Sequence, residues 1–98
     1  SKAEGTDSPT VLAAKIANEL LDISGVKASF VLTNYNDKIY ISARSIDEVN
    51  VQVMMEKLGG GGHINMAGAQ LKDCTTQEAE EKLRQMIDQM IADGDITQ

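Results

Sequence analysis

The residues best suited to chemistry lie in one short stretch, where four consecutive glycines, Gly59–Gly62, precede His63. A backbone without Cβ atoms can take positive φ and lets another group approach closely. Each glycine costs roughly 0.5–1 kcal/mol relative to Ala, and a helix end needs only one of them. Uncovered backbone N–H groups beside a histidine suit an anion such as phosphate. An anion-binding loop is therefore the leading hypothesis, with a flexible connecting loop as the alternative.

Arg44 is the cation that could complete such a site, because a forked guanidinium suits phosphate binding or stacking on a base. A helix of thirteen residues between Arg44 and the glycines would separate them by about 20 Å, so the loop must fold back for them to meet. A surface ion pair for Arg44 and a histidine bonded to its own loop are the alternatives. The candidate substrate-binding residues are Arg44, Gly60, Gly61, Gly62, His63 and Asn65.

The chain lacks the side chains that a catalytic metal centre needs. It has one histidine, no Asp-His-His motif and no cluster of aspartates at ligand spacing. No pattern places a base beside a nucleophile, and the lone Cys74 can form neither a disulfide framework nor a cysteine metal site within the chain. We therefore expect no catalytic residue and no metal ligand in this fragment.

Composition predicts a single small domain with an acidic surface. The chain has 98 residues, and nine basic against fifteen acidic residues give a net charge of −6. This balance argues against general nucleic-acid binding, which needs a basic face. No apolar run is long enough to span a membrane and no signal peptide is visible, so we expect a cytoplasmic domain without direct membrane contact.

Hydrophobic periodicity predicts the elements in chain order. Residues 1–8 have the composition of a linker, and apolar residues at helical spacing predict a helix from Pro9 to the stop at Gly25. Alternating patterns over 26–33 and 38–44 predict an antiparallel hairpin around the turn formers of 34–37.

Two capping boxes mark the helices that follow. Ser45 with Glu48 predicts a buried helix ending at Gly59, and Thr75 with Glu78 predicts a final helix ending at Gly94. Between them we expect a short helical turn over 63–67 and a strand over 68–72. The expectation is an α+β domain over 9–94, of order α-β-β-α-β-α, with helices on a mixed sheet and a frayed tail over 95–98.

Two motifs carry a resemblance to a known family. The stretch from Gly59 to Gln70 resembles the GGGH-x-x-A-(A/G)-G segment of the DHH-associated domain, the accessory half of DHH phosphoesterases, and residues 42–45, Ser-Ala-Arg-Ser, resemble its S-x-R-S segment. The Asn-Met-Ala-Gly-Ala-Gln variant of residues 65–70 is most similar to the membrane-anchored cyclic-di-AMP phosphodiesterases of GdpP type. The resemblance spans most of the chain.

The resemblance implies that two domains of one chain have different roles. A preceding DHH domain of the same chain would carry two manganese ions and the catalysis, and this domain would hold the cyclic dinucleotide or short oligonucleotide, with the histidine of the motif at a substrate phosphate. The expected reaction is hydrolysis of cyclic-di-AMP to linear pApA. The alternatives are an accessory domain of an oligoribonuclease or single-strand exonuclease, and an RNA-binding or dimerisation module like that of alanyl-tRNA synthetases. The sequence leaves homodimerisation through the helix faces open.

Overall fold

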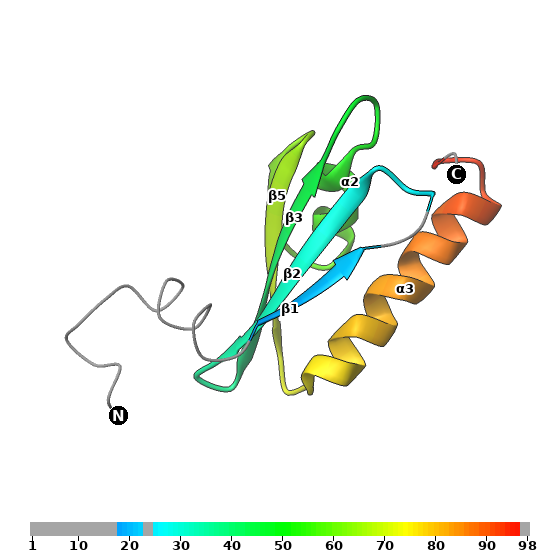
Figure 1. The fold of residues 1–98 in the computed structure, drawn as a ribbon. Helices are drawn as coiled ribbons and strands as arrows, with labels where there is room; N and C mark the ends of the chain where they lie inside the picture. The colour runs from blue at the N-terminus through cyan, green and yellow to red at the C-terminus, as the bar shows by residue number, and fades with distance from the viewer. Residues whose placement is uncertain (1–17, 23–24, 97–98) are drawn as a thin grey trace.

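The computed structural model describes residues 18–22 and 25–96, which form one antiparallel sheet with two helices packed on it (Figure 1). The α+β class predicted from the sequence is confirmed. The elements in chain order are β1 (Asn18–Asp22), β2 (Ala28–Tyr35), β3 (Lys38–Ser45), α2 (Val51–Lys57), β4 (Gly61–His63), β5 (Met66–Lys72) and α3 (Thr76–Ala92).

The sheet order is β1-β2-β3-β5-β4, and every pairing in it is antiparallel. The predicted mixed sheet is therefore wrong. The reason is β4, which the sequence did not show. Because the chain turns back through β4 before it enters β5, β5 runs opposite to β3 rather than parallel to it. Three residues with two glycines are too short and too poor in side chains to give a strand pattern.

The predicted hairpin is confirmed. β2 and β3 pair from Ala28 with Ser45 to Tyr35 with Lys38. The two residues of the turn, Asn36 and Asp37, have φ values of 54° and 63°. Positive φ at both central positions is the type I′ turn that matches the twist of the flanking strands, and Asn and Asp tolerate it better than most residues.

The predicted first helix is wrong where it can be compared. Residues 18–22 form β1, which pairs with β2 from Asn18 opposite Thr33 to Asp22 opposite Ser29. The other parts of that predicted helix, residues 9–17 and 23–24, and the predicted linker 1–8 lie outside the described residues. Hydrogen bonding to the edge of β2 outweighs a helical spacing of apolar residues, since local propensity is a weak preference.

Helix α2 is shorter than predicted and begins five residues later. Its N-cap is Asn50, whose side chain accepts a hydrogen bond from the Val53 amide at 3.1 Å. The predicted capping box at Ser45 and Glu48 does not form. Ser45 ends β3, and its hydroxyl donates to the Val49 carbonyl at 2.6 Å. A seven-residue helix is only about 10 Å long, so the glycine run begins much nearer to β3 than predicted.

Helix α3 confirms its predicted caps. Thr75 and Glu78 form a reciprocal capping box, and Gly94 follows the helix with a φ of 83°. Glu80 and Arg84, four residues apart on α3, form an ion pair at 3.6 Å. Ile96 lies in the predicted frayed tail, but it is only 7% exposed and packs in the core, so the ordered chain extends at least that far.

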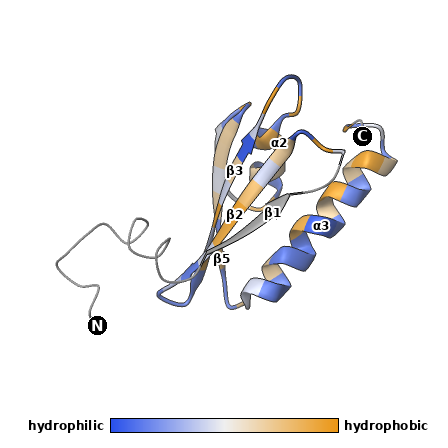
Figure 2. Ribbon diagram, in the orientation of Figure 1, coloured by the Kyte–Doolittle hydropathy of each residue, from blue (hydrophilic) through white to orange (hydrophobic). Residues whose placement is uncertain are grey.

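The core lies between the helices and one face of the sheet. Alternate residues of β2, β3 and β5 point into it, and α3 presents hydrophobic residues among hydrophilic ones (Figure 2). The most deeply buried large side chains are Phe30, Leu32, Ile39, Ile41, Val51, Met54, Met55, Leu83 and Ile87. We call this side of the sheet the inner face. The other residues of β2, β3 and β5 lie on the opposite side, the outer face, which α2 and α3 do not cover.

The N-cap role of Asn50 at the start of α2 can be tested by mutation. Replacing Asn50 by Ala removes the acceptor for the Val53 amide and is expected to lower the free energy of unfolding by about 1 kcal/mol. Replacing Glu48 by Ala is the matched control, with an expected change within about 0.5 kcal/mol. Urea unfolding of both variants measures the difference. A larger loss at Glu48 than at Asn50 would contradict this assignment.

Candidate functional site

Arg44 and His63 lie in one row of side chains across the outer face. Arg44 of β3 is opposite Met66 of β5, and Met66 is in turn opposite His63 of β4. Directly opposite residues point to the same face of an antiparallel sheet. Two strand spacings place the Cα atoms of Arg44 and His63 roughly 10 Å apart. The predicted return of the glycine loop towards the end of β3 is therefore confirmed.

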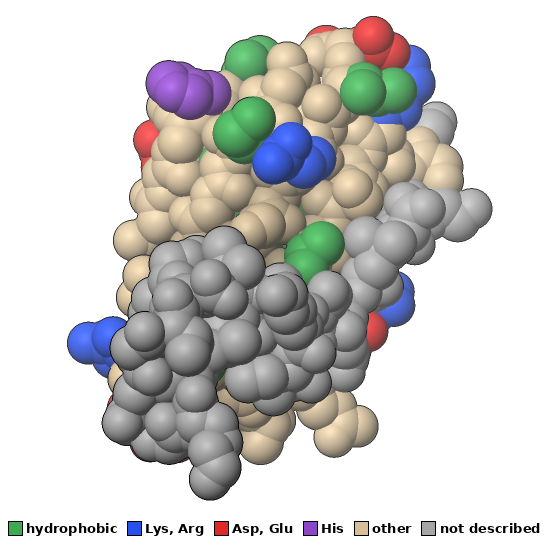
Figure 3. Space-filling view, turned by 60° about the vertical axis from the view of Figure 1, so that its left-hand side comes forward, with side chains coloured by type: hydrophobic (Ala, Val, Ile, Leu, Met, Phe, Trp, Pro, Cys, Tyr) green, Lys and Arg blue, Asp and Glu red, His purple; other side chains and the backbone are tan. Residues whose placement is uncertain are grey.

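The row is open to solvent. Arg44 and His63 are both exposed, and Met66 between them is 51% exposed. Figure 3 shows this side of the molecule, with the histidine at its upper edge and hydrophobic and basic side chains near it. A cation, an imidazole and a thioether thus share one accessible surface. That combination suits a ligand that carries both negative charge and apolar or aromatic surface.

Two of the four glycines allow the loop to lie directly on β5. A Cβ at Gly60 would come within 2.0 Å of the Gly68 carbonyl oxygen, and one at Gly62 would lie 2.5 Å from the Ala67 Cα. Neither position has room for a side chain. Gly59 has a different requirement, since it follows α2 with a φ of 88°. Three of the glycines therefore have structural reasons of their own.

Gly61 has no such reason. A Cβ there would meet no atom within 4 Å, and its φ lies outside the left-handed range. It pairs with Gly68, which pairs with Ser42 on the other side, so these three residues form the row next to Arg44 and His63. Gly61 and Gly68 leave this part of the outer face without side chains. The result is a bare backbone floor beside the cation and the imidazole.

The predicted cradle of glycine amides is only partly available. The Gly60 amide donates to the Met55 carbonyl at 2.8 Å, so it is occupied within the protein. β4 is an edge strand of the described sheet, and an antiparallel edge directs alternate backbone groups away from its neighbour. An anion at this edge would be held mainly by side chains, with support from the outward backbone groups of Gly61–His63. The predicted helical turn over 63–67 is wrong, because β4 and β5 occupy it.

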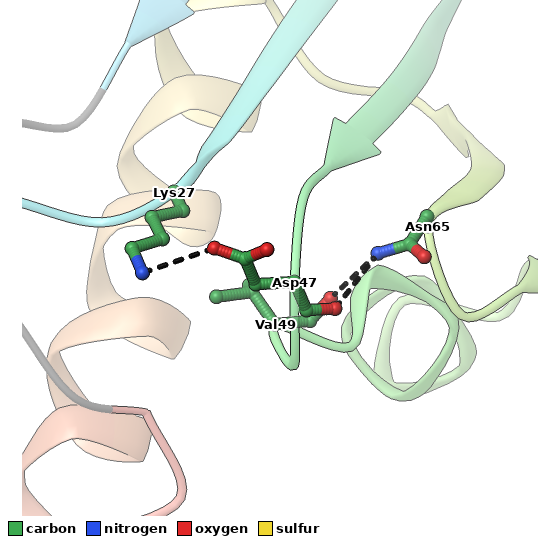
Figure 4. A network of polar contacts seen from close by, with 4 residues as sticks. All are labelled: Lys27, Asp47, Val49 and Asn65. Atoms are coloured by element: carbon green, nitrogen blue, oxygen red, sulfur yellow. Dashed lines mark hydrogen bonds and ion pairs between the residues drawn. The ribbon is translucent and has the colours of Figure 1, made fainter.

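Asn65 has a structural task that the sequence did not reveal. Its side-chain amide nitrogen donates to the Ser45 hydroxyl at 3.0 Å. The same nitrogen donates to the backbone carbonyls of Asp47 and Val49 at 3.3 and 3.5 Å (Figure 4). The backbone carbonyl of Asn65 accepts a hydrogen bond from the Ser45 backbone amide at 3.1 Å. These bonds join the end of β3, next to Arg44, to the turn that follows His63. We call them the Ser45–Asn65 clasp.

An exposed ion pair extends the clasp. Lys27 contacts Asp47 at 3.1 Å (Figure 4). Asp47 takes a φ of 56°. The hydrogen bond from Lys27 to Asp47, together with the negative charges of Asp47 and Glu48, raises the pKa of Lys27 above its ordinary value. Both partners are more than half exposed, so the pair contributes little to stability.

The described part of the chain contains neither a cluster of metal ligands nor a membrane-spanning helix. Among residues 18–22 and 25–96, no group of three or more His, Cys, Asp or Glu side chains comes together in a way that could hold a metal ion. No helix in these ranges combines the length and apolar character needed to cross a bilayer. Cys74 is a free, half-buried thiol.

Comparison with known proteins gives the family. Residues 4–93 match the DHHA1 domain. This chain belongs to the DHHA1 domain family. The match covers nearly the whole sequence and includes both motifs that carried the resemblance, so the family expectation is confirmed.

Relatives of this DHHA1 domain include enzymes of cyclic-di-AMP hydrolysis. It is 54% identical over 86 residues to the cyclic-di-AMP phosphodiesterase PdeA of Listeria monocytogenes, covering 87% of this chain and 13% of that protein. It is 56% identical over 78 residues to the cyclic-di-AMP phosphodiesterase GdpP of Geobacillus thermodenitrificans, covering 79% of this chain and 12% of that protein. It is 45% identical over 85 residues to GdpP of Bacillus subtilis, covering 86% of this chain and 13% of that protein. The chain thus spans only about an eighth of these relatives.

Sequence reasoning missed Ser42, Met66 and Gly68 as parts of this surface. The alternation of β3 does place Ser42 beside Arg44, and this signal was available. Met66 could not be assigned to a face, because the prediction put it in a helical turn, whereas β5 begins at this residue. Gly68 lay in the predicted strand over 68–72, but without β4 its partner Gly61 was not visible. A shift of one residue in register exchanges the two faces of a strand.

The glycines give a paired test of packing. Replacing Gly60 by Ala forces a Cβ into the Gly68 carbonyl and is expected to lower the free energy of unfolding by about 2–3 kcal/mol or more. Replacing Gly61 by Ala adds the same methyl group in open space, and stability should change by less than about 0.5 kcal/mol. Chemical denaturation of the two variants measures both values. Equal losses would show that the loop does not lie on β5 as described.

The clasp gives a second test. Replacing Asn65 by Ala removes one donor that serves three acceptors and should lower the unfolding free energy, in the absence of any ligand, by about 1–2 kcal/mol. Gln77, an exposed residue in the first turn of α3, provides the control substitution to Ala. A role limited to ligand contact predicts no loss of stability at Asn65, and that result would remove the clasp from the account.

Proposed function

We propose that this chain is the substrate-binding DHHA1 domain of a cyclic-di-AMP phosphodiesterase, and that it holds a phosphate of the cyclic dinucleotide between Arg44 and His63. The observation that supports it most is the shared row of these two side chains beside the bare backbone of Gly61 and Gly68. The names of the PdeA and GdpP relatives supply the substrate.

The chemistry of this binding follows from the two side chains. The guanidinium of Arg44 can give two parallel hydrogen bonds to phosphate oxygens, and the imidazole of His63 can donate from the other side. Charge-assisted hydrogen bonds contribute roughly 1.5–3 kcal/mol each. Without a Cβ at Gly61 or Gly68, the sugar–phosphate backbone can approach the sheet closely. These contacts must outweigh the general repulsion from a chain of net charge −6.

Hydrolysis itself is assigned to another part of the protein. We place the catalytic metal ions, expected to be manganese, in a DHH domain of the same chain, because the described residues of this domain offer no cluster of ligands for them. The role of Arg44 and His63 is then to bind and orient the dinucleotide so that one phosphodiester faces those metals. Binding of this kind lowers the barrier by fixing the reacting groups in position.

The proposal predicts which residues respond to ligand. On titration of the 98-residue chain with cyclic-di-AMP, the amide NMR signals of Gly61, Gly62 and His63 should shift, together with those next to Arg44. Replacing Arg44 by Ala should weaken binding about 10- to 100-fold, the equivalent of one charge-assisted contact. Arg84→Ala is the matched control, because Arg84 is an exposed arginine of α3, on the other side of the sheet.

Three results would change the conclusion. Absence of shifts at Gly61–His63 with millimolar ligand, or an equal loss of affinity in Arg84→Ala, would remove the phosphate site. Tighter binding of linear pApA than of cyclic-di-AMP would favour an oligoribonuclease domain. A strong gel shift with RNA and no response to dinucleotides would favour an RNA-binding module. The variant Gly61→Ala tests the bare floor separately, since it should weaken binding while leaving stability unchanged.

A further inference from the structure

A second feature of the outer face lies beside the proposed phosphate site and shares Gly68 with it. It is a depression of about 480 Å³. Side chains of β3 and β5 and the backbone at the start of the glycine run surround it. Its lining includes Tyr40, Ser42, Gly60, Gly68, Gln70 and Lys72.

Tyr40 and Gln70 form one wall of this depression. They are direct cross-strand partners on β3 and β5, so both rise from the outer face at the same level. Tyr40 is half-buried and Gln70 is exposed. The next pair on the same face of these strands is Ser42 with Gly68, and a Cβ is absent at Gly68. An aromatic ring and a carboxamide therefore border a low, bare stretch of backbone.

This pairing of groups is suited to a nucleobase. Bases stack on aromatic side chains, and a Gln carboxamide can donate to and accept from adenine N7 and N6 at the same time. Lys72 adds a positive charge at the far end of the depression, away from Arg44. A phosphate without a base cannot stack on the ring of Tyr40, whereas a nucleobase can stack on this ring and form hydrogen bonds with the amide of Gln70.

The distance to the phosphate site also fits. Tyr40 and Arg44 are four residues apart on β3 and on the same face, which places them about 13 Å apart along the strand. A nucleotide laid along β3 and β5 would put its phosphate at Arg44, its ribose above Ser42 and Gly68, and its base at Tyr40. The bare floor of Gly68 lies where the sugar must pass closest to the sheet.

We propose that the depression beside Tyr40 and Gln70 is a base subsite that binds an adenine of the ligand, with Tyr40 stacking on the ring and Gln70 selecting adenine over guanine. The inference rests on the proposed function, because it takes the phosphate at Arg44 and His63 as the anchor. It adds the residues that distinguish an adenine dinucleotide from other phosphate esters.

The test separates base recognition from phosphate binding by using three ligands. Cyclic-di-AMP, cyclic-di-GMP and ribose 5-phosphate, which has no base, are titrated into the 98-residue chain and its variants and followed by amide NMR shifts. Tyr40→Ala should lower the affinity for cyclic-di-AMP by about tenfold or more and leave the affinity for ribose 5-phosphate unchanged. Tyr40→Phe keeps the ring and should restore most of the affinity. Gln70→Ala should reduce the preference for cyclic-di-AMP over cyclic-di-GMP by about tenfold.

Tyr35 provides the matched control. It is a half-buried tyrosine at the end of β2, on the outer face and outside the depression, so Tyr35→Ala should not change the preference for adenine. Thermal unfolding of each variant confirms that it is folded.

The base-subsite proposal is wrong if Tyr40→Ala and Gln70→Ala leave the affinity for cyclic-di-AMP unchanged. It is equally wrong if they lower the affinity for ribose 5-phosphate as much as the affinity for cyclic-di-AMP. It is also wrong if Lys72→Ala, but not Tyr40→Ala, weakens cyclic-di-AMP, since the depression would then hold a second phosphate. Failure of all three ligands to bind the unmodified chain would instead overturn the phosphate site, and the base subsite with it.

Discussion

The close contact between the glycine run and β5 is the constraint on which the rest of this domain depends. At Gly60 and Gly62 the two backbones approach to distances that exclude any Cβ. That contact forms β4, sets its register against β5 and thereby brings His63 into the row of Arg44. The entropy cost of consecutive glycines is offset by a pairing that no larger residue at Gly60 or Gly62 would permit, so these two glycines are required by the fold itself.

The two faces of the sheet have separate tasks. The inner face packs against α2 and α3 and contains nearly all of the large buried side chains, so it provides the stability. The outer face carries Arg44, His63, Tyr40 and the bare glycine positions 61 and 68. Because side chains alternate between the faces, the residues of the proposed binding site can differ without a change in the core. The Ser45–Asn65 clasp connects the two tasks, since it fixes both strand ends that carry the proposed phosphate ligands.

Local chemistry explains which elements were predictable. The β2–β3 hairpin and α3 have strong signals of their own, namely alternation with Asn-Asp at the turn and a capping box before an apolar stripe. β1 and the start of α2 were mispredicted because tertiary contacts decided them. Residues 18–22 pair with the edge of β2. Ser45 and Glu48 have the spacing of a capping box, but Ser45 is the last residue of β3 and its hydroxyl donates to the Val49 carbonyl.

The sequence by itself determined the family, the α+β class and the residues of the proposed phosphate site, because these depend on residue types and motifs. The tertiary structure alone decided that Arg44 and His63 share a row, that the Gly60 amide is occupied within the protein, and that Asn65 supports the fold. The physical reason is that facing and register arise from pairing between segments far apart in the chain. A strand of three residues with two glycines carries almost no side-chain pattern from which that pairing could be read.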